Sequence, residues 1–262
     1  MIPPFLARLR QGHHTNRFPA EIPPVPDRLR GRPVIDATRC PADCQRCADA
    51  CSVEAITITT RDGRPSPRLD LGKCLFCPDC AEACPQQAIT FPPEHRLATR
   101  RREDLVVAEG QGYAQGLRLE AERLGLYGRS LKLRVVSAGG CNGCEVDVNV
   151  LGTLAWDIGR FGISFVASPR HADGLLLCGP VSRNMESAVR ATWAAIPSPK
   201  VCIAVGACAI AGGPFAGHPE QCGGATAAGL PVDLFIPGCP PHPLTILDGL
   251  LRLLGRIEEP RG

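Results

Sequence analysis

The 262-residue sequence has few aromatic side chains, little net charge and no long apolar run. Aromatic residues make up 5%, and the formal net charge of +3 is too small to indicate nucleic-acid binding or a polybasic membrane anchor. The longest apolar runs, such as "VCIAVGACAIAGG", are shorter than a membrane span. The opening "MIPPFLARLRQGHH" has prolines and arginines where a secretory signal has an apolar segment, so we expect no signal peptide.

Cysteine is the residue type that the sequence has in excess, with fifteen copies. Without a secretory signal, we expect the chain to fold in a reducing compartment, where a disulfide framework does not persist. Metal binding is therefore the leading interpretation of the cysteines. With 44% hydrophobic residues, the chain also has enough apolar material for a core of one or two domains.

The first half of the chain divides into an arm, a repeat and a linker. Residues 1–33 are a Pro/Arg-rich arm, in which "MIPPFLARLR" allows one short amphipathic turn lying on a partner surface or, alternatively, in a membrane. Residues 34–92 contain "CQRCADACSVEAIT", which returns thirty-three positions later as "CPDCAEACPQQAIT". This repeat predicts two pseudosymmetric halves, each with a short strand. Residues 93–130 are expected to form a linker with a helix around "LRLEAERLGL" and a solvated arginine run.

The second half of the chain, residues 131–256, alternates between strand and helix patterns. Strands are expected at "LKLRVVS", "ISFVAS", "GLLLC", "KVCIAV" and "VDLFIP", with helices starting near Glu145, Asn184 and Pro243. This alternation predicts an α/β domain with an open, mostly parallel sheet.

The second cysteine run, "CLFCPDCAEACP", has the spacing C-x2-C-x2-C-x3-C-P. In such a run three cysteines bind one [4Fe–4S] cluster and the fourth reaches the neighbouring cluster. This rule predicts one cluster on Cys40, Cys44, Cys47 and Cys84, and a second cluster on Cys74, Cys77, Cys80 and Cys51. The first run has three residues between Cys40 and Cys44 instead of two, which leaves Cys40 open as a ligand. Structural zinc is the alternative, although zinc ribbons usually present two separated Cys-x-x-Cys pairs.

A third site is predicted in the α/β domain. Cys141 and Cys144 follow the strand "LKLRVVS", Cys208 follows "KVCIAV", and Cys239 follows "VDLFIP". Ligand sites in open α/β sheets lie at the carboxyl ends of the strands, so these thiols are expected to converge. Cys178 and Cys202 lie inside apolar strands and are expected to be buried core thiols. Cys222, in a loop, is expected to be a free thiol, with a ligand role left open.

Two charged residues beside the third site are candidates for a supporting role. Glu145 follows the second cysteine at the start of a helix, where it either complements the helix dipole or contacts a partner subunit, for example in a proton relay. Arg183 follows another strand end, where it could tune the potential of the cluster by charge or hydrogen bonding.

Both halves resemble known families. The stretch "RGRPVIDATRC", the two cysteine runs and "EHRLATRRREDL" resemble the two-cluster ferredoxin subunit of formate hydrogenlyase-type hydrogenases. The combination of "AGGCNGCEVDV", "GACAIAGGPF" and "PGCPPHP" resembles the small subunit of energy-converting (group 4) [NiFe] hydrogenases, which is homologous to the 20 kDa (PSST-type) subunit of complex I. The resemblance implies a flavodoxin-like rear domain and a proximal [4Fe–4S] cluster on Cys141, Cys144, Cys208 and Cys239.

The resemblance implies a non-catalytic electron-transfer subunit with three [4Fe–4S] clusters. The expected partners are a [NiFe] hydrogenase large subunit or a complex I 49 kDa-like subunit, membrane subunits of the same complex, and a donor such as ferredoxin or formate dehydrogenase. It would lie in the cytoplasm, peripheral on the inner face of the membrane through those partners. The alternatives are the equivalent subunit of a complex I-like NADH- or ferredoxin-quinone oxidoreductase and, more remotely, a zinc-stabilised interaction module. Complex I relatives typically have adjacent cysteines where this chain has Cys-x-x-Cys, which favours the hydrogenase.

Overall fold

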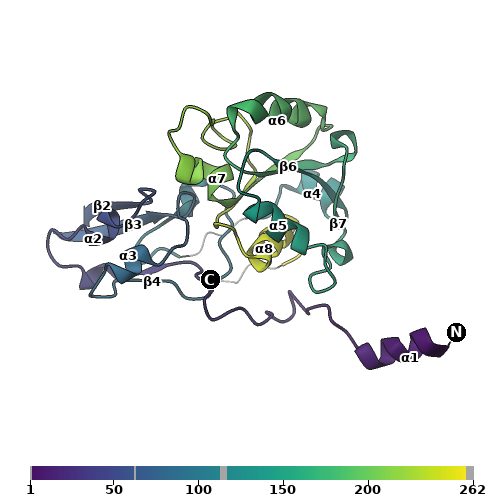
Figure 1. Ribbon diagram of the computed structural model, residues 1–262, viewed down its shortest axis with the longest axis horizontal. Coiled ribbons are helices and arrows are strands. Elements are labelled where there is room, and N and C mark those ends of the chain that lie inside the picture. The colour runs from purple at the N-terminus through teal and green to yellow at the C-terminus, as the bar shows by residue number, and fades with distance from the viewer. Residues whose placement is uncertain (1, 62, 113–116, 258–262) are drawn as a thin grey trace.

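A computed structural model of the protein describes residues 2–61, 63–112 and 117–257. Figure 1 shows a small cysteine-rich part, which carries α2, α3 and a short hairpin, beside a larger part built on a parallel sheet. The two parts share one hydrophobic core, in which Ile35 and Leu69 of the small part and Leu175 and Ile210 of the large part are buried together. The molecule therefore folds as one body, with the N-terminal helix standing apart from it.

The cysteine-rich part has the predicted twofold repeat. Its two short helices are α2 (Arg46–Asp49) and α3 (Asp79–Glu82), which start thirty-three residues apart. β1 (Val34–Ile35) pairs antiparallel with β4 (Ile89–Thr90). β2 (Ile56–Arg61) and β3 (Arg64–Asp70) form a hairpin, and β5 (Val106–Val107) pairs with β3.

The repeat extends to the backbone angles. Asp43 and Phe76, each directly before a Cys-x-x-Cys pair, have φ values of 57° and 56°. Glu54 and Gln87, which follow the last cysteine of each run, have φ values of 50° and 51°. Left-handed conformations are uncommon for residues other than glycine, so their recurrence at equivalent positions indicates that both cysteine loops fold in the same way.

The larger part contains a five-stranded parallel sheet, as the α/β prediction requires. Its strands are β6 (Leu131–Ser137), β7 (Ile163–Phe165), β8 (Gly174–Cys178), β9 (Val201–Val205) and β10 (Leu234–Ile236). They lie in the order β10-β9-β8-β6-β7, and every pairing is parallel. The chain order therefore reverses between β6 and β8, and the crevice outside such a reversal is the usual place for a ligand.

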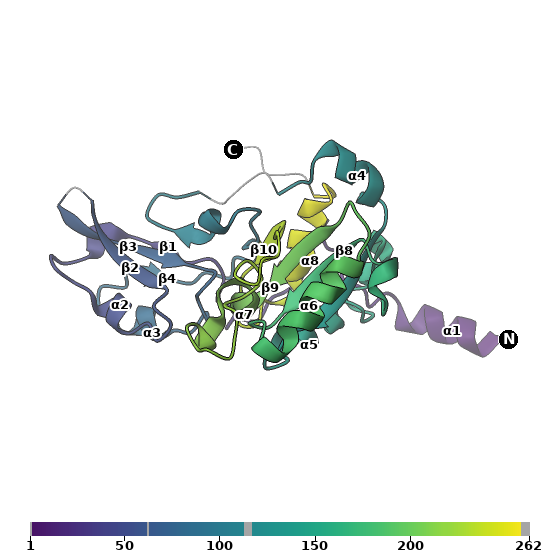
Figure 2. The same ribbon diagram turned by 90° about the horizontal axis from the view of Figure 1, so that it is seen from above.

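Helices cover both faces of this sheet (Figure 2). Alternate residues such as Leu176 and Ile203 pack with α5 (Gly143–Val150) and α8 (Pro243–Leu253), whereas Leu175 and Ala204 pack with α6 (Arg183–Ala195). Side chains alternate between faces along a strand, so both faces of these apolar strands are buried. Shorter helical elements are α4 (Ala121–Tyr127), α7 (Gly206–Ala211), and the 3-10 turns Ala37–Arg39, Arg102–Leu105, Ile158–Phe161, Pro169–His171 and Gly213–Phe215.

The predicted linker of residues 93–130, of which residues 113–116 lie outside the described part, makes contacts with both parts of the molecule. β5 belongs to the small sheet, and Thr99 exchanges backbone hydrogen bonds with Phe235 of β10. Arg102, expected in a solvated run, forms a double hydrogen bond with Asp70, at 2.7 Å and 2.6 Å. The segment instead fastens the two parts to each other, because its partners lie on both.

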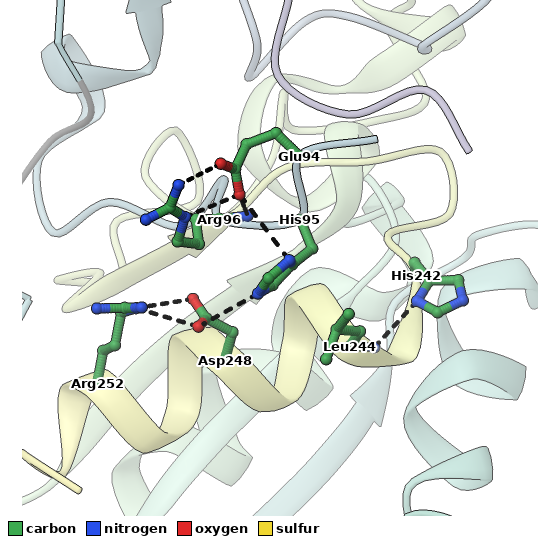
Figure 3. Close-up of polar contacts among 7 residues, drawn as sticks. All are labelled: Glu94, His95, Arg96, His242, Leu244, Asp248 and Arg252. Atoms are coloured by element: carbon green, nitrogen blue, oxygen red, sulfur yellow. Dashed lines mark hydrogen bonds and ion pairs between the residues drawn. The ribbon is translucent and has the colours of Figure 1, made fainter. Parts of the chain in front are cut away.

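A buried polar network holds the segment before Thr99 against α8 (Figure 3). The Asp248 side chain is 1% exposed and accepts from Arg252 Nε at 2.9 Å. His95 lies between two carboxylates, with Nε2 3.7 Å from Asp248 and Nδ1 3.9 Å from Glu94. Arg96 in turn donates to Glu94. The network thus connects the end of the cysteine-rich part to the last helix of the molecule.

The arm also differs from the prediction. Its first helix, α1 (Ile2–Gln11), is ten residues long, whereas we expected one short turn. Pro3 and Pro4 fall in the first turn, where a missing N–H breaks no helical hydrogen bond. Within the described residues, no helix combines the length and apolar character needed to cross a membrane.

Candidate metal centre

The thiols of the second cysteine run lie together with Cys51 of the first. The pKa of Cys74 is raised to about 12, mainly by burial, with contributions from the Cys80, Cys77 and Cys51 thiols. Burial likewise raises the pKa of Cys80 to about 12, followed by the effects of Cys77, Cys51 and Cys47. Such mutual effects require the four thiols Cys51, Cys74, Cys77 and Cys80 to be close in space. This is the ligand set that the spacing predicts for one cluster.

The other ligand set is also brought together, and it includes Cys40. Burial raises the pKa of Cys40, and Cys84 and Cys44 are the next largest causes. Burial raises the pKa of Cys47 to about 11, and Cys40 is the thiol that raises it most. A 3-10 turn, Ala37–Arg39, ends directly at Cys40. The shifted spacing therefore does not remove Cys40 from the group.

Backbone N–H groups donate to several of these sulfurs. Ala55 N lies 3.2 Å from Cys51 Sγ, and Ala88 N lies 3.3 Å from Cys84 Sγ, four residues along in both repeats. Phe76 N lies 3.2 Å from Cys74 Sγ. The left-handed residues before Ala55 and Ala88 turn these N–H groups inward. Sequence analysis missed the donors, although the alanine shared by "VEAIT" and "QQAIT" marked the position. Such bonds stabilise thiolates and tune the potentials of iron–sulfur clusters.

The third group assembles from three strand ends of the large sheet. Burial raises the pKa of Cys144, followed by the effects of Cys208, Glu145, Cys239 and Cys141. Cys208 lies in the first turn of α7, which directly follows β9, and Cys239 follows β10. The residue Asn142 between the first two cysteines is left-handed, with φ 71°. Parallel strands end at the same edge, so residues about a hundred positions apart converge there.

Glycines form a close cradle around this group. A Cβ added at Gly206, where φ is 88°, would lie 2.4 Å from Cys144 Sγ. At Gly213 a Cβ would lie 2.6 Å from Cys208 Sγ. Both contacts are too short for any side chain, so only glycine leaves these sulfurs free to point inward. The role of Gly213, five residues after Cys208, was not foreseen from the sequence.

The donor set fits a [4Fe–4S] core. Buried thiols that raise one another's pKa stay protonated when no cation is bound. Four thiolates can lie this close together only when a cationic core balances their negative charge. Within the described residues, no group of three or more Cys, His, Asp or Glu side chains has the geometry to hold a single metal ion. A cubane binds each thiolate at a different corner, so its ligands stand further apart than those of one ion. Cluster binding at the three groups stays a prediction.

Glu145 lies in the first turn of α5, as expected, and its surroundings are unusual. Its side chain is buried, and Oε1 has no hydrogen-bond partner among the described residues. It also contributes to the raised pKa of both Cys144 and Cys208. Burying a carboxylate oxygen without a hydrogen-bond donor costs more free energy than the interaction with the helix dipole returns. The helix dipole alone therefore does not account for a glutamate at this position. Its predicted role at a subunit interface remains a prediction.

Arg183 makes contacts that do not support its predicted role beside the third cluster. Its Nη1 lies 3.2 Å from Glu186 and 3.6 Å from Cys222 Sγ, and its Nε donates to Pro219 O. Cys222 in turn donates to Glu186 at 3.3 Å. These residues form a separate polar group at the start of α6, so Cys222 is a thiol with its own partners.

Cys178 and Cys202 are fully buried in strands β8 and β9, as expected. The pKa of Cys202 is raised to about 12, mainly by burial and in addition by the Asp233 carboxylate. Burial raises the pKa of Cys178, followed by the effects of Cys144 and Glu145, so this thiol lies near the third group. All fifteen cysteines lie in the described part of the chain, and none forms a disulfide.

Comparison with known proteins identifies both parts. Residues 141–253, which hold the third group of thiols, match the family described as the 20 kDa subunit of NADH ubiquinone oxidoreductase. Residues 39–88 match the 4Fe-4S dicluster domain. A probable membrane-bound hydrogenase subunit mbhJ of Pyrococcus furiosus is 40% identical over 136 residues, which are 50% of this chain and 78% of that protein. The chain belongs to the 20 kDa subunit family.

Two further relatives show the range of this family. Formate hydrogenlyase subunit 7 of Escherichia coli is 44% identical over 142 residues, which cover 54% of this chain and 55% of that protein. An NADH-quinone oxidoreductase subunit of Citrifermentans bemidjiense is 41% identical over 118 residues, which cover 45% of this chain and 68% of that protein. The chain thus spans about half of the E. coli protein, and relatives of the 20 kDa family are named as subunits of hydrogenase and of quinone-linked oxidoreductase complexes.

Proposed function

We propose that this chain is an electron-transfer subunit of a membrane-associated, energy-converting [NiFe] hydrogenase of the formate hydrogenlyase type. It would carry three [4Fe–4S] clusters in series, two in the ferredoxin part and one in the flavodoxin-like part. The partner beyond the third cluster would be a large subunit that holds the nickel–iron site. The remaining partners would be membrane subunits of the same complex and a donor such as ferredoxin or formate dehydrogenase.

The observation that carries this proposal is the proximity of the three groups of thiols to one another. Cys47 of the first group raises the pKa of Cys80 in the second group, after burial, Cys77 and Cys51. Cys77 of the second group raises the pKa of Cys239 in the third group, after burial and Cys141. Each group is therefore the neighbour of the next, and the second group lies between the other two. A series of neighbouring sites is what electron transfer through a protein requires.

The chain's own residues position and insulate the path. Each bound cluster supplies the chemistry, since it takes up and releases one electron. Cys47, Cys74 and Cys80 are buried, which keeps water from the middle of the path. The N–H groups of Ala55 and Ala88 stabilise the negative charge on the sulfurs.

Cys141 and Cys239 are exposed, so the third group opens onto the surface of this chain. A partner subunit that covers this opening would receive or deliver the electron there. Glu145 Oε1, which has no hydrogen-bond partner among the described residues, lies beside the same group, and a donor from that partner would satisfy it.

A complex I-like quinone oxidoreductase is the second candidate, because the NADH-quinone oxidoreductase subunit of Citrifermentans bemidjiense also aligns at 41% identity. The two candidate functions differ in the substrate that the assembled complex uses, which is hydrogen for the first and quinone for the second. We expect the complex of this chain with its large subunit, purified without oxygen, to reduce all three clusters under hydrogen gas. Quinone reduction by the same complex, with no hydrogen-dependent reduction of the clusters, would favour the second candidate and contradict the proposal.

A further inference from the structure

The N-terminal helix α1 exposes the apolar side chains that a packed helix would bury. In both views it stands away from the body of the molecule (Figures 1 and 2). Phe5 and Leu9 are each 76% exposed and Leu6 is 45% exposed. In the described part of the chain, the hydrogen bonds of residues 3–12 stay within the helix and its last turn. A helix of ten residues is marginal in water, so a surface must stabilise it.

Residues 15–18, which follow the helix, are fixed to the body of the molecule. Thr15 Oγ1 donates to Leu154 O at 2.9 Å, and Asn16 N donates to Ala155 O at 2.9 Å. Arg160 donates to Asn16 O and Phe18 O. The side chain of Phe18 is buried in the core next to α8. The arm therefore presents α1 from a firm base, on the side of the molecule away from the cysteine-rich hairpin (Figure 1).

The charge of the chain is concentrated in this arm. The first twenty residues contain Arg8, Arg10 and Arg17 and no acidic residue, which gives +3. The remaining residues have 26 basic and 26 acidic side chains (29 − 3 and 26 − 0), so they sum to zero. The surface that α1 meets is therefore expected to be negatively charged.

The arrangement of side chains around α1 favours a lipid surface over a protein groove. Successive residues turn by about 100° in an α-helix, so Phe5, Leu6 and Leu9 share one face. Arg8 and Arg10 project along the two opposite borders of that face. A helix lying in a membrane interface places apolar side chains among the acyl chains, while flanking arginines reach the phosphates on both sides.

We propose that α1 binds the surface of an anionic lipid bilayer and lies in the plane of the interface, so that this chain contacts the membrane itself. The driving contributions are burial of Phe5, Leu6 and Leu9 and attraction of Arg8 and Arg10 to lipid phosphates. A single helix of this size gives reversible binding, which the other subunits of a complex would reinforce. The proposal is independent of the redox role of the chain.

The test is flotation of the full chain, purified with its clusters, on phosphatidylcholine vesicles with and without phosphatidylglycerol. We expect wild-type protein to float with the vesicles that contain phosphatidylglycerol. The double variant Phe5→Glu/Leu9→Glu should lose at least about tenfold of this partitioning. The variant Arg8→Gln/Arg10→Gln should lose about fivefold per arginine, and raised salt should reproduce part of that loss in the wild type.

The control is Leu126→Glu, on α4, where a leucine is similarly exposed at 56%. It should float like the wild type, and all variants should keep the cluster absorbance because α1 is not part of the core. Failure of the wild type to float, equal flotation without phosphatidylglycerol, or normal flotation of Phe5→Glu/Leu9→Glu would each overturn the proposal. If the variant Phe5→Glu/Leu9→Glu floats normally but no longer co-purifies with the large subunit, α1 binds a protein and the lipid assignment is wrong.

Discussion

Replacing Cys239 with alanine will remove one cluster and leave the other two. Cys239 is the last of four thiols around the third group, and Cys141 and Cys208 both lie close enough to share its electrostatic effects. A cubane with three protein ligands and an exposed fourth iron is labile. We therefore expect the iron content of anaerobically purified protein to fall from about twelve atoms per chain to about eight. Iron and sulfide analysis measures this directly.

The matched control is Cys202→Ala. Cys202 is also a cysteine of the large sheet, but it is fully buried, and burial and Asp233 raise its pKa. This variant should retain all of its iron and lose only some stability through the small cavity. If Cys239→Ala keeps about twelve iron atoms per chain, or if Cys202→Ala loses as much iron as Cys239→Ala, the third ligand set is wrong.

Removing the carboxylate of Asp248 will destabilise the fold strongly. Asp248 pairs with Arg252 inside α8 and faces His95, and all three side chains are at most 7% exposed (Figure 3). The variant Asp248→Ala leaves the Arg252 charge buried without this partner. Breaking such a pair costs about 3–5 kcal/mol of folding free energy. Chemical denaturation of the full chain, followed by circular dichroism, measures the loss.

The chain offers a control with nearly the same geometry on the surface. Arg17 and Glu21 are also four residues apart and also 2.9 Å from each other, but their side chains are 76% and 63% exposed. The variant Glu21→Ala should cost about 1 kcal/mol or less, because water solvates both charges and screens them. Equal losses in the two variants would contradict the view that the Asp248 network joins the cysteine-rich part to α8.

The sequence predicted those features whose cause is local. The parallel strands start and end within a few residues of the predicted positions, because each is a short apolar run bounded by glycine, proline or charge. The helix α8 begins at Pro243, as predicted, because proline is tolerated at the first helical position and the His242 side chain accepts a hydrogen bond from Leu244 N. The twofold repeat was visible because the cysteines recur at one spacing. In each case the residues that decide the structure are neighbours along the chain.

The features that were missed depend on partners far away in sequence. Arg102 looked like part of a solvated run because its partner, Asp70, lies thirty-two residues earlier. For Glu145 the sequence left a helix-dipole role and a partner contact open, and only the fold shows that it is buried without a donor among the described residues. Arg183 lies near a strand end, but its contacts go to Glu186 and Cys222. The two prolines of α1 argued against a long helix, yet both fall in its first turn, where proline is tolerated.

The order of the three clusters could not be predicted from spacing alone. Spacing assigns thiols to groups, but it does not say which ferredoxin cluster lies beside the third one. The effect of Cys77 on the pKa of Cys239 places these two thiols near each other, and their proximity depends on how the linker segment fastens the two parts through Thr99 and Arg102. In the proposed series, the second cluster would be the middle of the path and the first cluster its outer end.

The most direct test of this account is electron paramagnetic resonance of the fully reduced chain, compared with the Cys77→Ala variant. The wild type should show three reduced [4Fe–4S] clusters with spin–spin splitting between neighbours. The variant should lose the middle cluster, and the signals of the outer two should become sharp and independent. Persistent splitting between the remaining two clusters, or a wild-type protein that contains zinc and no iron, would contradict a series of three clusters.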